Sequence, residues 1–393
     1  MNSLIGLEAK RIKKIPTYLF ADLDKLKHKY QQQTGERIID YGEGNPLFSP
    51  PKSIIKYFVS SLKKPENHRY PSYAGKITAR TAVVKWYKNR FGVKLDPYTE
   101  VAMLIGSKEG VAHLIWSIID KDDIAYVPSP SYPVYLNQII LTGGIPHILP
   151  LLEKNAFLPD LDQIKPNKKL KLLCLNYPNN PTAAVAPLTY YNEVVKKAQK
   201  YGFYCFNDNV YSELYYNKQP HSILEIPGAK EHCIEFHSLS KTCSMAGWRI
   251  GFVVGNKDII KALLRIKQNV DSGPFGAIQD AAIYALNNID EIGKKIRGEY
   301  QKRLSLLVRS LNKLGWKANM PEATFYLWTK IPSEKYKQDS LSFTYSLLEK
   351  SGILVAPGCG FGNAGEGYIR FAAIVSLNDI KLSIKRLIAS KLL

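Results

Sequence analysis

Short, continuous apolar runs recur along the middle of the chain and alternate with longer segments of helical periodicity. The runs cover residues 101–105, 124–127, 170–175, 203–206, 234–239 and 250–254. The helical segments include 76–91, 111–119, 191–201 and 257–267. Strands that are apolar on both faces and alternate with helices are typical of a mainly parallel sheet covered by helices on both sides. The pattern therefore predicts an α/β domain.

The two ends of the chain show a different pattern. A basic arm leads to an amphipathic stretch at 19–30, and after about residue 287 a long charged helix is expected. The elements predicted there are helices over 292–314, 341–350 and 377–392 and strands over 323–329 and 353–356. We expect a smaller α+β domain. The predicted division is residues 1–46 as arm and part of the small domain, 47–287 as the large domain, and 288–393 as the small C-terminal domain.

Polar and glycine-rich stretches directly follow several of the predicted strands. They are 176–182, 208–211 and 238–241, together with Gly106-Ser-Lys-Glu-Gly between a strand and a helix. Ligands of mainly parallel sheets bind beyond the carboxyl ends of the strands. A helix N-terminus also favours an anion, although Ser107 equally suits a simple helix cap. Their shared placement favours a ligand site over a set of plain turns.

The stretch 238–251, Ser-Leu-Ser-Lys-Thr-Cys-Ser-Met-Ala-Gly-Trp-Arg-Ile-Gly, surrounds a single lysine with small and hydroxyl residues. A desolvated lysine amine is a good nucleophile, so Lys241 suits a buried Schiff base. The hydroxyls and Arg249 suit an anionic group of a cofactor. Read alone, the stretch is equally compatible with a surface turn that carries a solvated lysine.

Composition limits the classes of function. The chain has 393 residues, of which 45% are apolar, and a formal net charge of +20. This length fits two domains or a large domain with a satellite. The charge invites a nucleic-acid or membrane interpretation. However, the lysines are spread along the whole chain, and neither a zinc-ligand spacing nor a helix-turn-helix is evident, so we expect no nucleic acid, no membrane and no metal as partner.

The cysteines and the apolar spans bear on location. The five cysteines lie far apart, and an odd number argues against a disulfide framework. Cys174 and Cys205 stand inside apolar runs, where a free cysteine behaves as a small hydrophobe. Neither a signal-peptide core nor an uninterrupted apolar span of about 18 residues is seen. A cytoplasmic protein is therefore expected.

The motifs and their order resemble the class I/II aminotransferases, which carry pyridoxal 5′-phosphate on the type I fold. The segments His68-Arg-Tyr-Pro-Ser-Tyr, Gly106-Ser-Lys-Glu-Gly, Glu235-Phe-His-Ser-Leu-Ser-Lys-Thr and Gly365-Glu-Gly-Tyr-Ile-Arg look most like those of LL-diaminopimelate aminotransferases. Met245-Ala-Gly-Trp-Arg and Asn180-Pro-Thr-Ala also look like bacterial alanine aminotransferases. The resemblance covers essentially the whole chain. It implies a mainly parallel seven-stranded sheet in a large domain plus a smaller α+β domain.

This resemblance implies a cofactor site. In it, Lys241 carries pyridoxal phosphate as a Schiff base and moves the substrate proton, and Asp208 faces the pyridine nitrogen. Tyr211, one helical turn beyond Asp208, and Asn180 bind the phenolic oxygen, and Tyr132 stacks on the ring. Plainer interpretations are a helix cap, a turn asparagine and a half-buried tyrosine. The implied phosphate ligands are Ser107, Lys108, Ser238, Ser240 and Arg249.

The resemblance also implies a substrate site and a subunit partner. Arg370 matches the arginine that binds the α-carboxylate, and Asn45 is expected near the same group, with Asn180 and Tyr132 also in the substrate site. Tyr70 matches a residue that a neighbouring subunit contributes to the phosphate, which implies a two-fold homodimer. The substrates implied are an amino acid and a 2-oxo acid.

The predicted function is transfer of an α-amino group to 2-oxoglutarate by a ping-pong mechanism. The leading donor is LL-diaminopimelate, of lysine and cell-wall precursor synthesis, whose distal charges need partners; Lys108 and Glu109 are candidates. Alanine, aspartate or aromatic donors are alternatives, and a carbon–sulfur lyase uses the same scaffold. A basic regulatory protein would need a DNA-binding domain, for which there is no room before residue 40.

One position departs from the family pattern. The family commonly has glycine after Asn-Pro-Thr, where this chain has Ala183. Alanine also occurs there in the alanine aminotransferase branch. We expect a small backbone adjustment and an active enzyme.

Overall fold

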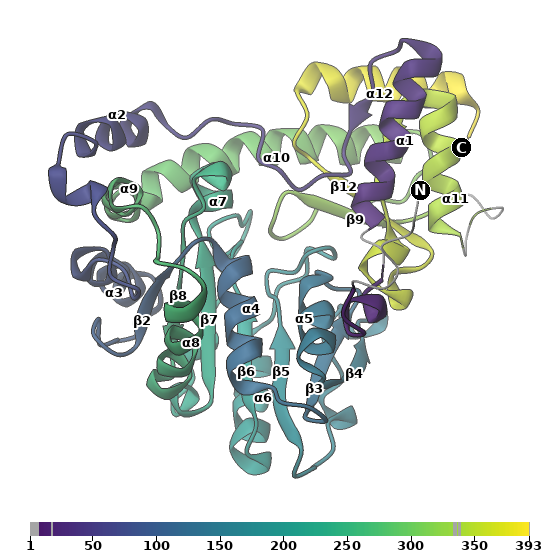
Figure 1. The fold of residues 1–393 in the computed structure, drawn as a ribbon. Helices are drawn as coiled ribbons and strands as arrows, with labels where there is room; N and C mark the ends of the chain where they lie inside the picture. Colours follow the sequence, from purple (N-terminus) through teal and green to yellow (C-terminus); the bar gives the residue numbers. More distant parts are fainter. Residues whose placement is uncertain (1–7, 17–18, 333–335, 337–338, 393) are drawn as a thin grey trace.

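The apolar runs in the middle of the chain build one large sheet, shown in the ribbon of the computed structural model (Figure 1). The structure describes residues 8–16, 19–332, 336 and 339–392, so the first seven residues of the predicted basic arm lie outside the described residues. The strands are β2 (Val101–Leu104), β3 (Ile124–Ser129), β4 (Ile145–Pro150), β5 (Leu170–Leu175), β6 (Tyr204–Asp208), β7 (Cys233–Ser238) and β8 (Gly251–Gly255).

In the described part of the chain these strands form a seven-stranded sheet in the order β2-β8-β7-β6-β5-β3-β4. All neighbouring pairs are parallel except those that β8 makes with β2 and β7. Strand β8 therefore runs against the other six. The predicted α/β class with a mainly parallel seven-stranded sheet is confirmed.

Helices cover both faces of the sheet. Side chains alternate along each strand, so Ala102 and Leu104 belong to one apolar cluster and Val101 and Met103 to another. The first face is covered by α4 (Ser107–Ile118), α5 (Val134–Thr142) and α8 (Lys257–Val270). The second is covered by α3 (Ile77–Phe91), α6 (Leu188–Tyr201) and α9 (Gly276–Asn287), with α2 (Lys52–Ser61) packed on α9.

A smaller α+β part stands over one edge of this sheet (Figure 1). Strands β9 (Tyr326–Lys330), β11 (Ala356–Pro357) and β12 (Tyr368–Ala372) form an antiparallel sheet, and β1 (Ile39–Asp40) pairs in parallel with β10 (Ile353–Leu354). The helices are α1 (Leu19–Thr34), α11 (Ser340–Ser351), α12 (Leu377–Ser390) and the long α10 (Ile289–Lys313), which contacts α9 and α12. Trp316, Phe343 and Phe371 are buried in the core of this smaller part.

The pairing of β1 with β10 ties the N-terminal segment to the C-terminal part of the chain. This pairing supports the division at residues 46 and 287, which we retain as a proposal about domain organisation. None of the helices in the described ranges is long and apolar enough to cross a bilayer.

The elements that were not predicted from the sequence include β4, α2, α5 and α9. Strand β4, Ile-Pro-His-Ile-Leu-Pro, lies at the sheet edge and is largely exposed. Proline is tolerated at a sheet edge because an edge strand need not donate every ladder hydrogen bond. The two prolines and the histidine of β4 interrupt the continuous apolar run by which the other strands were predicted.

Candidate active site

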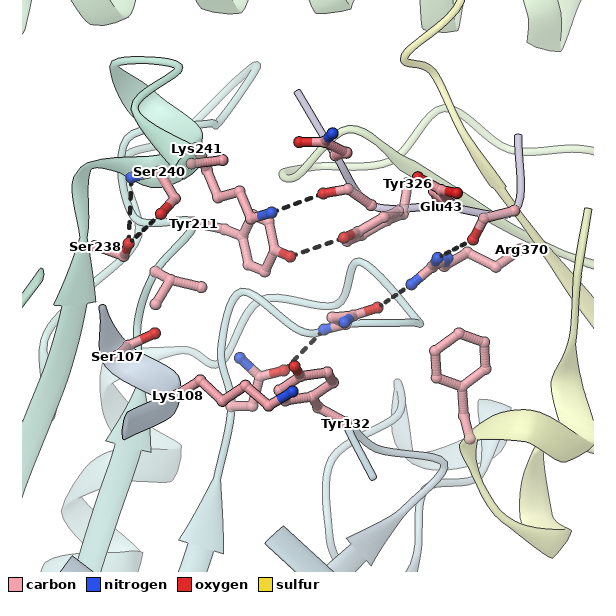
Figure 2. A pocket seen from close by; sticks show the side chains of 18 of the residues that line it. Glu43, Ser107, Lys108, Tyr132, Tyr211, Ser238, Ser240, Lys241, Tyr326 and Arg370 are labelled. Atoms are coloured by element: carbon pink, nitrogen blue, oxygen red, sulfur yellow. Dashed lines mark hydrogen bonds between the residues drawn. The ribbon is translucent and has the colours of Figure 1, made fainter. Parts of the chain in front are cut away.

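The carboxyl ends of the parallel strands open into a cavity of about 450 Å³ between the large sheet and the smaller part (Figure 2). Six strands end at this edge, and β8, which runs the other way, begins there. The reversal of β8 thus brings Arg249, which lies two residues before the start of this strand, to the same edge. The predicted residues that line the cavity are Asn45, Ser107, Lys108, Tyr132, Asn180, Asp208, Tyr211, Ser238, Ser240, Lys241, Arg249 and Arg370.

Two of the candidate residues, Tyr70 and Glu109, do not line this cavity within the described chain. The side chain of Tyr70 is 91% exposed, on the loop before α3. A cavity of this chain alone therefore lacks Tyr70, and its predicted role depends on a second subunit.

Lys241 projects from the short helix α7 (Leu239–Thr242), which starts where β7 ends. The Ser238 hydroxyl caps this helix by accepting from the Ser240 N–H. The Lys241 Nζ donates to the Gly44 carbonyl at 2.6 Å. Removal from solvent, with the nearby charges of Arg370 and Arg249, lowers the pKa of Lys241 to about 8, and Asp208 opposes this shift. The lysine amine is therefore easier to deprotonate than a surface lysine, as a nucleophile requires.

Asp208 ends β6 with its carboxylate buried beneath the cavity. Its Oδ2 accepts from the Tyr135 hydroxyl at 2.7 Å, whereas Oδ1 has no hydrogen-bond partner among the described residues. Burial raises the pKa of Asp208 from 3.8 to about 6, although the Tyr135 hydrogen bond and Lys241 pull it down. A buried carboxylate oxygen without a donor is costly, and this one lines the cavity.

Tyr211 reaches the cavity, but not by the predicted route. Residues 210–213 form turns, so the helical turn expected between Asp208 and Tyr211 is wrong. The Tyr211 hydroxyl lies 2.8 Å from the hydroxyl of Tyr326. Because Tyr326 belongs to β9, this bond joins the large sheet to the smaller part across the cavity.

Arg370 enters the cavity from β12 with its guanidinium fixed on several sides. Nη1 donates to Asn180 Oδ1 and Nη2 to the Gly42 carbonyl, each at 2.7 Å. The guanidinium carbon lies 4.2 Å from the ring centre of Tyr326 and 4.7 Å from that of Phe361. Arginine stacks on aromatic faces and holds a planar fork of donors. The arrangement suits a carboxylate ligand.

Hydroxyls, a guanidinium and a helix start meet at the other end of the cavity. The Ser238 hydroxyl donates to the Ser240 hydroxyl at 2.9 Å. In the described chain no side chain caps α4, and Ser107 and Lys108 at its start line the cavity, so its first N–H groups are available to an anion. Gly106 has φ +82°, and a Cβ there would lie 2.2 Å from Arg249 Nη2. Glycine is therefore needed for Arg249 to approach the helix start.

The chain matches the family model for aminotransferase class I and II over residues 36–387. The chain is a class I/II aminotransferase. It is 48% identical to the LL-diaminopimelate aminotransferase of Aquifex aeolicus over 368 residues, which cover 93% of this chain and 94% of that protein. It is 46% identical to the LL-diaminopimelate aminotransferase of Natranaerobius thermophilus, with 96% and 98% covered.

Solved structures agree with this family and with the type I fold. The substrate-bound BacF structure from Bacillus subtilis superposes with a TM-score of 0.92 at 34% identity, covering 97% of this chain and 96% of that one. A single mutant of Thermus thermophilus aspartate aminotransferase gives 0.89 at 26% identity, covering 99% and 100%. This aminotransferase is accordingly a pyridoxal-phosphate-dependent transaminase.

The residues of the aminotransferase cavity fit pyridoxal phosphate. The Asp208 Oδ1 has no donor among the residues that the structure describes, and a protonated pyridine nitrogen can supply one, while the Lys241 amine suits the aldehyde. The dianionic phosphate matches the hydroxyls of Ser238 and Ser240, the uncapped start of α4 and Arg249. The acceptor at one end of the cavity thus suits the pyridine nitrogen, and the donors at the other end suit the phosphate.

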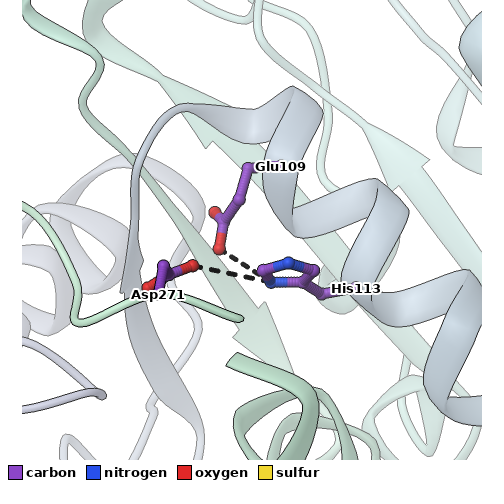
Figure 3. A group of neighbouring side chains, drawn as sticks. All are labelled: Glu109, His113 and Asp271. Carbon is purple, nitrogen blue, oxygen red and sulfur yellow. Dashed lines mark ion pairs between the residues drawn. The ribbon is translucent and has the colours of Figure 1, made fainter. Parts of the chain in front are cut away.

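Glu109 does not reach the cavity of this aminotransferase, which overturns its candidacy for the distal charge of the substrate. Its Oε1 accepts from Lys267 Nζ at 2.8 Å, and its Oε2 accepts from the Ile105 N–H at 3.2 Å. His113 Nδ1 lies 2.8 Å from Glu109 Oε1 and 3.8 Å from Asp271 (Figure 3). Three such groups suit a metal ion, but the buried ammonium of Lys267, also 2.7 Å from Asp271, already supplies the positive charge.

Ala183 takes the left-handed backbone conformation, with φ +60°, and is buried. Its N–H donates to the Asn179 carbonyl at 3.0 Å, within the turn that presents Asn180. Glycine adopts this conformation without strain, so the alanine costs about 1 kcal/mol there. The turn accommodates the substitution with this local strain.

Several residues at this site were not predicted from the sequence. Tyr135, which donates to Asp208, lies in the first turn of α5, only three residues after the predicted Tyr132, and this closeness in sequence could have revealed it. Tyr326 and Phe361 come from the smaller part, where no local pattern marks them. The charged side chains at the mouth of the cavity, on α1 and around β1, were also not predicted.

We predict that Asp208→Asn changes the pH dependence of stability of the cofactor-free enzyme. The folded carboxyl, with a pKa near 6, holds its proton more tightly than in the unfolded chain, where it is near 3.8. Ionisation therefore destabilises the wild type increasingly from about pH 4 to about pH 6 and by a constant amount above, about 3 kcal/mol. The stability of the variant relative to wild type should rise by up to that amount between about pH 4 and pH 7. Denaturant unfolding across this range measures it, and a pH-independent difference would contradict the buried, unpaired charge.

Lys267→Met should destabilise the enzyme by about 3 kcal/mol, because two carboxylates would lose the ammonium between them. The same change releases Glu109 from α8, so the start of α4 should bind the cofactor more weakly. Urea unfolding and absorbance titration with pyridoxal phosphate measure the two effects. Lys261→Met, an exposed position of the same helix, is the matched control and should change stability by no more than about 0.5 kcal/mol. Equal stabilities of the two variants would show that the buried ion pair is not a major support.

Proposed function

We propose that this aminotransferase transfers the α-amino group of LL-diaminopimelate to 2-oxoglutarate. The observation that carries the donor is the 43–48% identity, over nearly the whole chain, to several LL-diaminopimelate aminotransferases. The site supports the reaction class, because a fixed guanidinium, a lysine amine of lowered pKa and a buried carboxylate line one cavity. This activity belongs to the synthesis of lysine and cell-wall precursors.

In this proposal, Arg370 binds and orients the substrate. Its bonds to Asn180 and to the Gly42 carbonyl fix the plane of the guanidinium, so the α-carboxylate meets a preset fork of donors. Asn45 lines the same part of the cavity. With the carboxylate held, the Cα–H bond of the substrate is kept within reach of Lys241, which removes the orientational freedom that would slow proton transfer.

Lys241 and Asp208 perform the acid–base work. Pyridoxal phosphate, when bound, supplies a pyridine ring that accepts the electron pair left on Cα. The Lys241 Nζ takes the proton from Cα as a general base and later returns it as a general acid. Asp208, which is ionised above about pH 6, stabilises positive charge at the ring nitrogen and so favours electron withdrawal. Tyr211 and Asn180, which line the cavity, would hold the phenolic oxygen, and Tyr132 would cover the ring face.

The phosphate end of the cavity anchors the cofactor while Lys241 is engaged with the substrate. Ser238, Ser240 and Arg249 supply donors, and Ser107 and Lys108 add the start of α4. We further propose that Tyr70 of a second subunit completes this end, in a two-fold homodimer. The support is its 91% exposure together with that of its neighbours Tyr73 and Ile77, at 43% and 37%, since apolar side chains exposed in a row suit an interface. Five free cysteines, four of them buried, support a cytoplasmic location.

The decisive assay for the donor measures glutamate formed from 2-oxoglutarate by the purified holoenzyme. LL-diaminopimelate should give the highest kcat/KM in a panel that includes alanine, aspartate and phenylalanine. Arg370→Ala should lower kcat/KM for every α-amino acid about 10²–10⁴-fold, because two charge-assisted hydrogen bonds are lost. A preference for alanine or aspartate would overturn the proposed donor. Pyruvate and ammonia released from cystathionine without an oxo-acid acceptor would indicate a lyase.

Complementation tests whether Tyr70 acts across subunits. Lys241→Ala and Tyr70→Ala subunits, carried on different tags and isolated as hybrids, should regain about half of the wild-type activity. The reason is that one site per hybrid then combines an intact Lys241 with the intact Tyr70 of the partner subunit. Hybrids as inactive as the parent variants would place Tyr70 in its own subunit's site or outside the site.

A further inference from the structure

A cluster of four charged side chains lines the mouth of the active-site cavity, opposite the large sheet. It consists of Asp24 and Lys27 of α1, Asp40 of β1 and Glu43 of the following loop, and we call it the mouth cluster. Lys27 Nζ lies 2.8 Å from Asp24 Oδ1, 2.9 Å from Asp40 Oδ2 and 2.9 Å from Glu43 Oε1. Burial opposes the charge of Lys27, but the three carboxylates raise its pKa well above the usual range. One ammonium thus serves three carboxylates, and the cluster keeps a net negative charge in a strongly basic protein.

Glu43 is the member of the mouth cluster that lies nearest in sequence to the substrate machinery. The residue before it, Gly42, accepts from Arg370 at 2.7 Å, and the residue after it, Gly44, accepts from Lys241 at 2.6 Å. The backbone on both sides of Glu43 is therefore fixed against the two groups that handle the carboxylate and the proton. In Figure 2 the side chain of Glu43 lies on the same side of the cavity as Tyr326 and Arg370.

Glu43 also retains acceptor capacity for a ligand. Its side chain is 50% exposed, against 25% for Asp40, whose other oxygen is taken by the Gly42 N–H at 2.7 Å. Glu43 Oε1 accepts from Lys27, and within the described chain no hydrogen bond to its Oε2 is found. A carboxylate accepts on both oxygens, at about four positions. Lys27 therefore orients Glu43 without exhausting it.

The acidic residue of the cavity wall that lies outside the mouth cluster cannot accept a distal group of the substrate. Asp208 lies at the buried end of the cavity, bonded to Tyr135 and placed for the cofactor. A substrate bound through its α-carboxylate at Arg370 and its α-amino group near Lys241 directs its side chain away from Asp208. A charged distal group must meet a partner there, because an unpaired charge is costly to desolvate.

We propose that Glu43 determines donor specificity by accepting the distal ammonium group of a diamino acid substrate, with Lys27 as the positioning residue that orients it. This proposal rests on the proposed function, since it assumes a donor with a second amino group. It replaces Glu109, which the fold keeps out of the cavity, as the acidic partner for that group.

The two substrates of a ping-pong cycle provide an internal comparison. Glutamate and 2-oxoglutarate enter the same cavity, but their distal group is a carboxylate and they carry no distal ammonium. Glu43 offers them no attraction, since like charges repel. Loss of its charge should therefore affect the half-reaction with the diamino donor and spare, or slightly improve, the half-reaction with glutamate.

The test uses Glu43→Gln holoenzyme in single-turnover absorbance measurements of each half-reaction. With LL-diaminopimelate, the apparent affinity should fall roughly 10–100-fold, as expected for one charge-assisted hydrogen bond, with little change in the limiting rate. With glutamate and with alanine, which lacks a distal charge, the values should stay within about three-fold of wild type. Glu36→Gln, the same change of charge beside β1 but outside the cavity lining, is the matched control and should leave all three donors unchanged.

The outcomes separate the possible failures. A loss of equal size for all three donors would overturn the specificity role and make Glu43 a structural support for Arg370 and Lys241. An unchanged affinity for LL-diaminopimelate would overturn the proposal outright, while leaving the proposed function in place. A wild-type enzyme that does not react with LL-diaminopimelate at all would remove the proposed function, and the role of Glu43 with it.

Discussion

The site depends on two ionisable groups that are both held in environments unfavourable to their charges. Burial disfavours the carboxylate of Asp208, one oxygen of which meets no donor in the described part of the chain, and the same environment lowers the pKa of Lys241. Neither group would be arranged in this way for stability alone, because an apolar pair would pack there at lower cost. A bound cofactor relieves both penalties, since a protonated ring nitrogen and an aldehyde are the partners that the two groups lack. Cofactor binding at this edge of the sheet should therefore also raise the free energy of unfolding of the enzyme.

The sheet fixes where this chemistry can occur. Strands β2, β3, β5, β6 and β7 deliver polar residues at their carboxyl ends, and the reversed β8 delivers Arg249 at its start. The groups that we propose to bind the substrate come from elsewhere, because Arg370, Tyr326 and the loop after β1 belong to the smaller part. The bond between the hydroxyls of Tyr211 and Tyr326 closes the two halves around the cavity. Cofactor and substrate functions therefore arise on different supports and meet only in the folded chain.

The sequence predicted what local patterns encode. Apolar strands followed by polar turns located Asp208, Asn180 and Lys241, and resemblance to a family supplied their roles together with Arg370. Edge strand β4 was missed because its prolines and exposure break the apolar pattern. The mouth cluster was missed for a different reason: Lys27 and Glu43 are 16 residues apart and meet only because β1 pairs with β10. Glu109 was misjudged because its partner, Lys267, stands 158 residues away in sequence. Contacts between segments that are far apart in sequence leave no periodic pattern in either segment, so they could not be predicted.

The loop after β1 is anchored at two carbonyls, one held by the Gly42–Arg370 bond and the other by the Gly44–Lys241 bond. Tyr326 presses on the same loop, since a Cβ at Gly44 would lie 2.4 Å from its hydroxyl. Both donors are side chains of the site itself, so the position of this loop and the orientation of Arg370 and Lys241 are set together. A larger residue at Gly44 would therefore disturb the carboxylate-binding guanidinium and the lysine amine at once, although the loop supplies neither group.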